Sequence, residues 1–152
     1  VQITSLAKSK PKEYSARTRG CIVQLMAKYR VILPTNLKPS PARYELSAAQ
    51  LLAEYFKTDI EFMPRSNLKT PDFLIDGVKW ELKSPTGDGK RNIERQLQIG
   101  IKQSKHIIFD ARRSRIHITK IKNVLKYQFR LAKSIKRLLL IDKSKNVIEL
   151  TR

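Results

Sequence analysis

The chain has 152 residues, with 32 Lys and Arg against 13 Asp and Glu, which gives a formal net charge of +19. This length predicts one domain with room for a short appendage, and 41% hydrophobic residues are enough for a core. The single cysteine, Cys21, excludes an internal disulfide framework and a cysteine-rich zinc site. No apolar run approaches the roughly 20 residues of a membrane-spanning helix, so we expect no membrane span.

The positive charge is concentrated towards both ends of the chain. Residues 1–40 hold eight basic residues and one acidic residue, residues 41–111 hold eleven and ten, and residues 112–152 hold thirteen and two. Lys and Arg release the counterions condensed on a phosphate backbone, so the basic flanks predict nucleic acid as the partner. A membrane surface or an acidic protein would also be attracted.

The first forty residues differ in composition from the rest. The chain opens at Val1 without Met and without a signal-peptide pattern, as expected of a domain released from a longer protein, although a cloning choice would look the same. Helical spacing predicts one helix from about Glu13 to Leu33. Prolines between positions 34 and 41 predict a linker. We therefore expect a basic N-terminal extension over residues 1–40 and a domain over residues 41–152.

The second region alternates between helical and strand patterns. Apolar periodicity predicts helices over residues 42–56, 90–105 and 118–135. Strand patterns cover residues 59–63, 73–75, 78–82, 106–109, 137–142 and 147–150. This order is typical of an α/β fold, in which helices flank a central mixed β-sheet.

An Asp-Gly pair between two strand-forming runs predicts a hairpin. Asp76-Gly77 separates residues 73–75 from residues 78–82. The pair favours a two-residue type I′ turn, because both turn positions need a positive φ. The resulting register opposes Phe73 to Trp80 and Asp72 to Glu81, and strand alternation predicts one apolar face. The other face then carries Asp72, Lys79, Glu81 and Lys83.

The opposed acids on this face predict a metal site. Directly opposed residues on neighbouring strands hold their Cβ atoms roughly 5 Å apart, where two carboxylates repel each other. A divalent cation between Asp72 and Glu81 removes the repulsion, and Mg²⁺ prefers carboxylate, water and phosphate oxygens. The alternative is an exposed charge ladder in which Lys79 and Lys83 partner the two acids.

Lys83 lies two residues after Glu81 and therefore on the same face of the strand. A lysine there can orient or deprotonate a water, or neutralise charge on the phosphorane. A metal beside it polarises the scissile phosphate and lowers the pKa of its water. Together these residues predict hydrolysis of a phosphodiester, with Mg²⁺ or Mn²⁺ as the cofactor.

The same residues resemble a known nuclease signature. Pro71-Asp72, eight further residues and then Glu81-Leu82-Lys83 match the motif of the PD-(D/E)XK nuclease superfamily. The resemblance implies that the two parts of the motif lie on adjacent strands, after a helix that bears another acidic residue. Glu45 matches that position and would be a third or water-mediated metal ligand. Glu54 is the rival, but it lies roughly half a turn around the helix from Glu45, so both cannot easily face the hairpin.

A closer resemblance covers about residues 41–142. Residues 69–77, 80–85 and 96–104 look like segments of the C-terminal tRNase toxin domains of contact-dependent growth inhibition (CdiA) systems and related polymorphic toxins. The resemblance implies a nuclease that is released from a larger secreted or surface protein and cuts tRNA in the cytoplasm of a competing bacterium. It also implies an immunity protein, which we expect to be acidic. Related domains differ in whether they cut RNA or DNA, which leaves the substrate open.

Several basic residues outside the motif are candidates for contacts with nucleic acid. The predicted helix over residues 90–105 carries a basic stripe, and an arginine cluster follows the next predicted strand. Arginine suits phosphate because its guanidinium can bind two oxygens at once. The plain alternative for each is a solvated helix face or turn. The candidates are Lys79, Arg91, Arg95, Lys102, Arg112, Arg113 and Arg115.

These patterns lead to one hypothesis and two alternatives. The hypothesis is an α/β nuclease toxin that cleaves tRNA, in which Asp72, Glu81 and Glu45 hold the metal and Lys83 acts on the water or the phosphate. The first alternative is a DNA endonuclease of restriction, repair or transposition. The second is a non-catalytic basic module that binds nucleic acid. Digestion of tRNA and plasmid with and without a chelator separates the three.

Overall fold

The computed structural model describes residues 14–18, 21–25, 28–66 and 69–152. In these residues the helices are α1 (Arg43–Phe56), α2 (Asn92–Ile101) and α3 (Ile118–Leu131). The strands are β1 (Tyr14–Thr18), β2 (Cys21–Leu25), β3 (Val31–Ile32), β4 (Ile60–Phe62), β5 (Phe73–Ile75), β6 (Val78–Lys83), β7 (His106–Asp110), β8 (Arg137–Ile141) and β9 (Val147–Leu150). No helix of the described part has the length and apolar character needed to cross a membrane.

Strands β3 to β9 form one mixed sheet, and they lie side by side in chain order. The pairs β4–β5, β5–β6 and β8–β9 are antiparallel, whereas β3–β4, β6–β7 and β7–β8 are parallel. Helix α2 connects β6 to β7 and α3 connects β7 to β8, because parallel neighbours need a long crossover. The predicted α/β fold with a central mixed sheet flanked by helices is confirmed.

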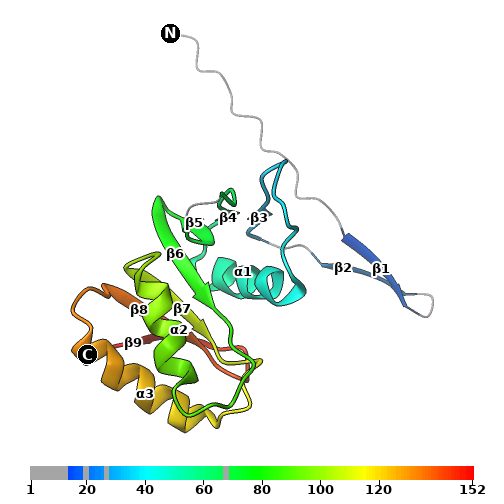
Figure 1. Ribbon diagram of the computed structural model, residues 1–152. Coiled ribbons are helices and arrows are strands. Elements are labelled where there is room, and N and C mark those ends of the chain that lie inside the picture. The colour runs from blue at the N-terminus through cyan, green and yellow to red at the C-terminus, as the bar shows by residue number, and fades with distance from the viewer. Residues whose placement is uncertain (1–13, 19–20, 26–27, 67–68) are drawn as a thin grey trace.

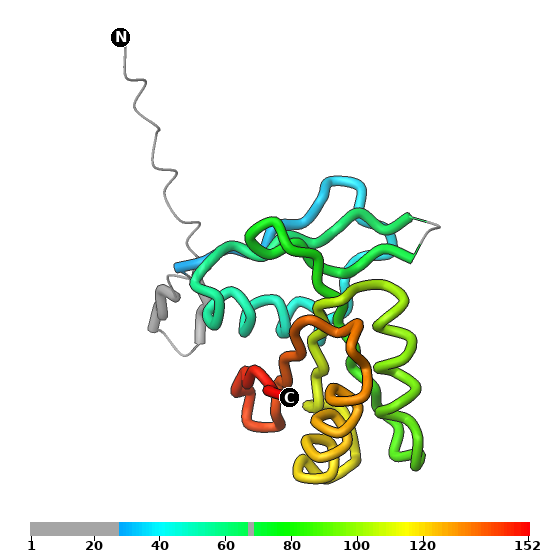
Figure 2. Tube along the Cα trace, turned by 90° about the vertical axis from the view of Figure 1, so that its left-hand side faces the viewer, coloured from blue at the N-terminus to red at the C-terminus, as the bar shows by residue number. Residues whose placement is uncertain are grey.

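Helices cover both faces of this sheet (Figure 1), with α1 on one side and α2 and α3 on the other (Figure 2). Alternate residues of the central strands therefore enter different cores. Ile108 and Leu139 pack with α1, whereas Ile107 and Leu138 pack with α2 and α3. Strands buried on both faces have nearly continuous apolar sequences, as β8 does.

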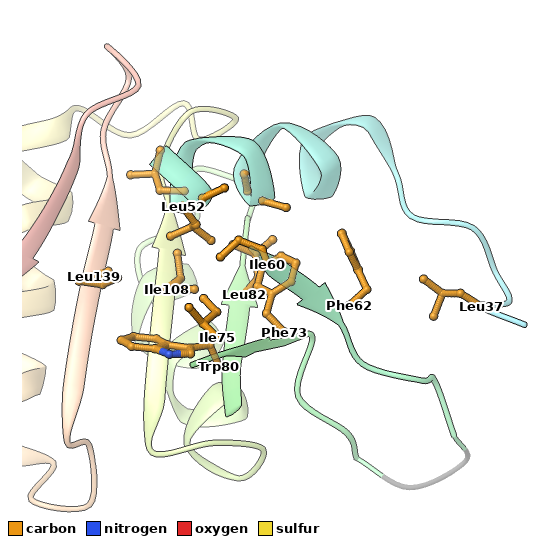
Figure 3. Packing of buried hydrophobic residues seen from close by; sticks show 14 residues of the cluster. Leu37, Leu52, Ile60, Phe62, Phe73, Ile75, Trp80, Leu82, Ile108 and Leu139 are labelled. Carbon is orange, nitrogen blue, oxygen red and sulfur yellow. The ribbon is translucent and has the colours of Figure 1, made fainter. Parts of the chain in front are cut away.

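The core beneath α1 orients the strand that carries the motif. In this core Leu52 of α1 packs with the side chains of Trp80 and Leu82, which come from β6 (Figure 3). Burial of each large apolar side chain contributes about 1.5–3 kcal/mol. Because Trp80 and Leu82 enter this core, strand alternation turns Glu81 and Lys83 towards the opposite face of the sheet, where α2 packs.

The hairpin of β5 and β6 has the predicted register. Phe73 pairs with Trp80 and Ile75 pairs with Val78. Asp76 and Gly77 have φ angles of 47° and 75°, and a type I′ turn requires positive values at both positions. The turn therefore sets the register on which the predicted site depends.

The prediction for the N-terminal segment was wrong. In place of one helix from about Glu13 to Leu33, the described residues form β1, β2 and β3. Strands β1 and β2 pair antiparallel as a separate two-stranded sheet. Gly20, between them in the sequence, is a hairpin signal that the helical interpretation passed over.

The segment before residue 40 also contributes to the main sheet. Strand β3 pairs with β4, and Leu37 is buried in the core beneath α1. Arg30 forms an ion pair with Asp59 at 2.9 Å. Residues 1–13 of the predicted extension lie outside the described residues, and the division into residues 1–40 and 41–152 stays a prediction.

Candidate active site

Asp72 directly precedes β5, and its side chain reaches the backbone of β6. Its own backbone oxygen accepts a hydrogen bond from the N–H of Met63 at 2.9 Å, which ties it to the end of β4. Its carboxylate Oδ2 accepts a hydrogen bond from the N–H of Leu82 at 2.8 Å. This bond brings the carboxylate next to Glu81. The charge of Asp72 raises the pKa of Glu81. The structure thus brings the two predicted acids together.

Glu81 and Lys83 form a largely buried polar group between β6 and α2. Glu81 is only 2% exposed, and its Oε1 accepts a hydrogen bond from Nζ of Lys83. The same Nζ donates to Oε1 of Gln103, just after α2, at 2.9 Å. The aliphatic part of Lys83 packs against Gly100. A Cβ added to Gly100 would lie 3.5 Å from the Cγ and Cε atoms of Lys83. The lysine is therefore held at both its stem and its amine.

Both carboxyl groups are shifted towards protonation. Burial, and then the charge of Asp72, raise the pKa of Glu81 to about 7, although the ion pair with Lys83 opposes the shift. Burial also raises the pKa of Asp72, against the hydrogen bond from Leu82 and the charge of Lys83. One lysine therefore faces two carboxylates that burial disfavours in their charged form. An exposed charge ladder of Asp72, Glu81 and the two lysines does not describe this pair.

Glu45 lies in the first turn of α1, near the acidic pair. Its Oε2 accepts a hydrogen bond from the N–H of Ala42 at 2.6 Å, and Nη2 of Arg65 lies 3.0 Å from both of its carboxylate oxygens. The charge of Glu45 raises the pKa of Asp72, whereas exposed Glu54 has no such effect. Of the two candidates for a third acid, the geometry favours Glu45, and its role stays a prediction.

The acidic pair fits a divalent cation. Oε2 of Glu81 is buried and has no hydrogen-bond partner among the described residues, an arrangement that costs free energy unless a ligand completes it. Carboxylate oxygens are the donors that Mg²⁺ and Mn²⁺ take. Within the described ranges, no group of three or more His, Cys, Asp and Glu side chains is arranged to hold a metal ion. In this arrangement Glu45 is bound by Arg65.

A cleft of about 670 Å³ opens beside Lys83. The loop after β6, the start of α2, Tyr44 of α1 and Arg113 after β7 form its walls. Its basic lining residues are Lys83, Lys90, Arg91, Arg95 and Arg113, and no acidic residue is among the lining residues of the described chain. Such a lining suits an anionic ligand next to the acidic pair.

The structure separates the predicted nucleic-acid contacts into groups. Arg91, Arg95 and Arg113 line the cleft, as a contact to phosphate requires. Arg112 turns inward to Asp110 at 2.7 Å and donates to Ser47 and to the backbone of Tyr44, so we leave it out of the binding surface. The remaining predicted residues are exposed but do not line the cleft, and they are Lys79, Lys102 and Arg115.

Three features of the site were not predicted from the sequence. Gln103 lies in a segment that carries the family resemblance, but nothing in its spacing indicated a bond to Lys83. Arg65 binds Glu45 from a loop twenty positions away. Arg113 lies over the ring of Tyr44 at 3.9 Å from its centre. Each contact joins segments that only the tertiary structure brings together.

Comparison with known proteins gives a fold and a family. A solved structure, a "CdiA-CT/CdiI toxin and immunity complex from Burkholderia pseudomallei", has a chain similar to this one with a TM-score of 0.60 and 19% sequence identity. The similarity covers 82% of this chain and 99% of that chain. At this identity the likeness concerns the fold. No curated protein gave a significant match.

A family model provides the assignment. The family described as "Contact-dependent growth inhibition CdiA C-terminal domain" matches residues 69–147, just over half of the chain. The matched region begins before Asp72, includes β5 to β8 with α2 and α3, and ends at the start of β9. It therefore contains Asp72, Glu81, Lys83 and Gln103. The chain belongs to the family of CdiA C-terminal domains of contact-dependent growth inhibition.

Proposed function

We propose that this chain is a metal-dependent nuclease of the PD-(D/E)XK type and the toxin domain of a contact-dependent growth inhibition system. The observation that carries the proposal is the pair of half-buried Asp72 and buried Glu81, with Lys83 beside it at the wall of a basic cleft. Burial of two like charges costs free energy, so stability alone does not explain the arrangement. Perturbed carboxyl groups beside a cleft are typical of a catalytic site.

Each residue has a role in this proposal. Asp72 and Glu81 would hold Mg²⁺ or Mn²⁺, and Glu45 would be a third or water-mediated ligand. A bound ion polarises the scissile phosphate and lowers the pKa of a coordinated water. Lys83, held between Glu81 and Gln103, orients the attacking water or stabilises the negative charge that develops at the phosphate.

The proposed substrate is nucleic acid, with tRNA as the first choice. The net charge of +19 and the basic lining of the cleft support a polyanion. These contacts involve charge rather than base edges, so they favour binding without sequence readout. The choice of tRNA rests on the resemblance of residues 69–77, 80–85 and 96–104 to tRNase toxin domains.

An immunity protein is the proposed protein partner. The similar Burkholderia chain comes from a complex of a toxin and an immunity protein. A partner of this chain would meet a surface of net charge +19, so we propose that it is acidic and covers the basic cleft. We further propose that the domain is released from a larger secreted or surface protein and acts in the cytoplasm of the target cell.

The test is digestion of total RNA and of plasmid DNA by the purified protein, with Mg²⁺ or with a chelator. The matched variants are Glu81→Gln and Glu61→Gln, because Glu61 is exposed on β4. We expect RNA cleavage that the chelator and Glu81→Gln abolish and that Glu61→Gln retains. Cleavage of plasmid alone would indicate a DNA endonuclease. Binding without cleavage of either substrate would indicate a non-catalytic module, and the proposal would be wrong.

A further inference from the structure

Arg113 lies over an aromatic ring at the wall of the cleft. The central carbon of its guanidinium is 3.9 Å from the centre of the Tyr44 ring, and both residues line the cleft. Tyr44 is half-buried and packs against the core beneath α1, so its ring is a fixed support. Arg113 is exposed, which leaves the other face of its guanidinium open to a ligand.

A second contact joins Arg113 to the residue that follows Lys83 at the end of β6. Its Nη1 donates to the backbone oxygen of Ser84 at 3.4 Å, and Ser84 directly follows Lys83. The neighbouring Arg112 is occupied by Asp110 inside the protein, so of the two only Arg113 is available in the cleft. A ligand that stacks on Arg113 would therefore lie in the cleft that Lys83 also lines.

The size and charge of the cleft limit what can lie there. Pockets of about 300–1,000 Å³ hold one drug-sized ligand, so a volume of about 670 Å³ suits one or two nucleotides. Lys90, Arg91 and Arg95 provide cations for the phosphates. A base within a duplex is stacked on both sides by its neighbours, so its face is not available to a guanidinium.

We propose that the cleft takes an unpaired nucleotide beside the scissile phosphate, with its base stacked on Arg113 and Tyr44 beneath. Bases of single strands stack on guanidinium planes and aromatic rings whatever their identity, because every base has a π face. The inference deepens the proposed function, because it names unpaired segments, such as loops and ends, as the substrate class. An unpaired base and its phosphate are common to RNA and DNA.

Binding can be measured without cleavage, in a chelator. The probes are labelled 12-nucleotide single strands of RNA and of DNA, and blunt duplexes of the same sequences, titrated with the full chain and followed by fluorescence anisotropy. Arg113→Lys keeps the charge but removes the plane. Arg43→Lys is the matched control, because Arg43 is exposed beside Tyr44 but does not line the cleft.

We expect Arg113→Lys to weaken binding of a single strand by about 10-fold, within the range measured for one stacked base, and to leave duplex binding within about 2-fold. Arg43→Lys should change neither. A 2-aminopurine base in the strand should lose fluorescence on binding to the wild type and less so with Arg113→Lys. Stronger binding of single-stranded RNA or of single-stranded DNA identifies the source of the nucleotide, and either result supports the inference.

A second pair of variants tests the support beneath Arg113. Tyr44→Phe keeps the ring and should bind single strands as the wild type does, whereas Tyr44→Leu should weaken them in the same way as Arg113→Lys. Equal weakening of single strand and duplex by Arg113→Lys, or no weakening, would overturn the inference. If nothing is cleaved but the Arg113 effect is found, the proposed function fails and the inference stands. If the protein cleaves nucleic acid but Arg113→Lys has no selective effect on single strands, the inference fails and the proposed function stands.

Discussion

The acidic pair and the basic cleft adjoin each other but hold their charges in different ways. Glu81 is buried and Asp72 is half-buried, and both are held by hydrogen bonds from β6 and lie close to the charge of Lys83. Arg91 and Arg95 lie on the exposed surface of the cleft. Buried charges depend strongly on their few partners, whereas exposed charges interact weakly and are screened by salt. Single substitutions should therefore have large effects inside and small, cumulative effects at exposed Arg91 and Arg95.

Neighbouring arginines give the sharpest contrast. Arg112 is paired with fully buried Asp110, so Arg112→Met leaves an uncompensated interior charge. We expect it to lower the free energy of unfolding by about 3–5 kcal/mol. Arg113→Met should lower it by less than about 1 kcal/mol, because it removes one exposed cation–π contact. Urea denaturation of both variants measures the difference, and equal decreases would remove the distinction between inward and outward arginines.

Removal of the Lys83 amine should have the next largest effect. We expect Lys83→Met to slow RNA cleavage by at least about 100-fold while binding in a chelator stays within a few-fold, since the lysine acts on the reacting groups. Lys120→Met, at an exposed position of α3, is the control and should cleave as the wild type does. Near-normal cleavage by Lys83→Met would exclude the lysine from the reaction.

Stability should depend on pH through the acidic pair. Burial and the charge of Asp72 raise the pKa of Glu81 from 4.5 to about 7. Between these values the folded protein binds more protons than the unfolded chain, so the free energy of unfolding falls as the pH rises from about 4.5 to about 7 and levels off above that. In a chelator we expect a decrease from pH 6 to pH 8 on the order of 1 kcal/mol.

Glu81→Gln isolates this effect from the other titrating groups. Glutamine does not ionise, so the difference in melting temperature between pH 6 and pH 8 should become smaller than in the wild type. Thermal unfolding of both proteins in a chelator checks this. The same pH dependence in the variant would show that Glu81 is not the group responsible.

The smallest effect per residue should come from Arg91 and Arg95 of the cleft. We expect the double change Arg91→Gln and Arg95→Gln to reduce the slope of log affinity against log salt for a single strand by about 1.4, because each phosphate that an arginine neutralises adds roughly 0.7 to the slope. Anisotropy titrations at several salt concentrations in a chelator measure the slope. An unchanged slope would place the phosphates elsewhere on the protein.

The central part of the site could be predicted because it depends on local geometry. The Asp76-Gly77 turn sets the register of two adjacent strands, and the alternation of side chains then places Asp72 near Glu81 and turns Lys83 to the same side. Apolar periodicity predicted the helices and strands after residue 41 to within a few residues, because each carries a stripe or run that faces a core.

The rest of the site required the tertiary structure. The bond of Lys83 to Gln103 and the contact of Tyr44 with Arg113 join residues twenty or more positions apart, so no local pattern contains them. Among three closely spaced arginine candidates, the sequence could not tell that Arg112 turns inward to Asp110. In the N-terminal segment, spacing compatible with a helix competed with a hairpin signal at Gly20, and the strands β1 and β2 formed instead.

The central claim, that Asp72 and Glu81 hold one divalent cation, is tested most directly by calorimetric titration of the protein with Mn²⁺ at pH 8. We expect one site in the wild type and in Glu61→Gln, and loss of that site in Asp72→Asn and in Glu81→Gln. Binding of Mn²⁺ that is unaffected by both of the latter changes, or no binding by the wild type, would contradict the claim.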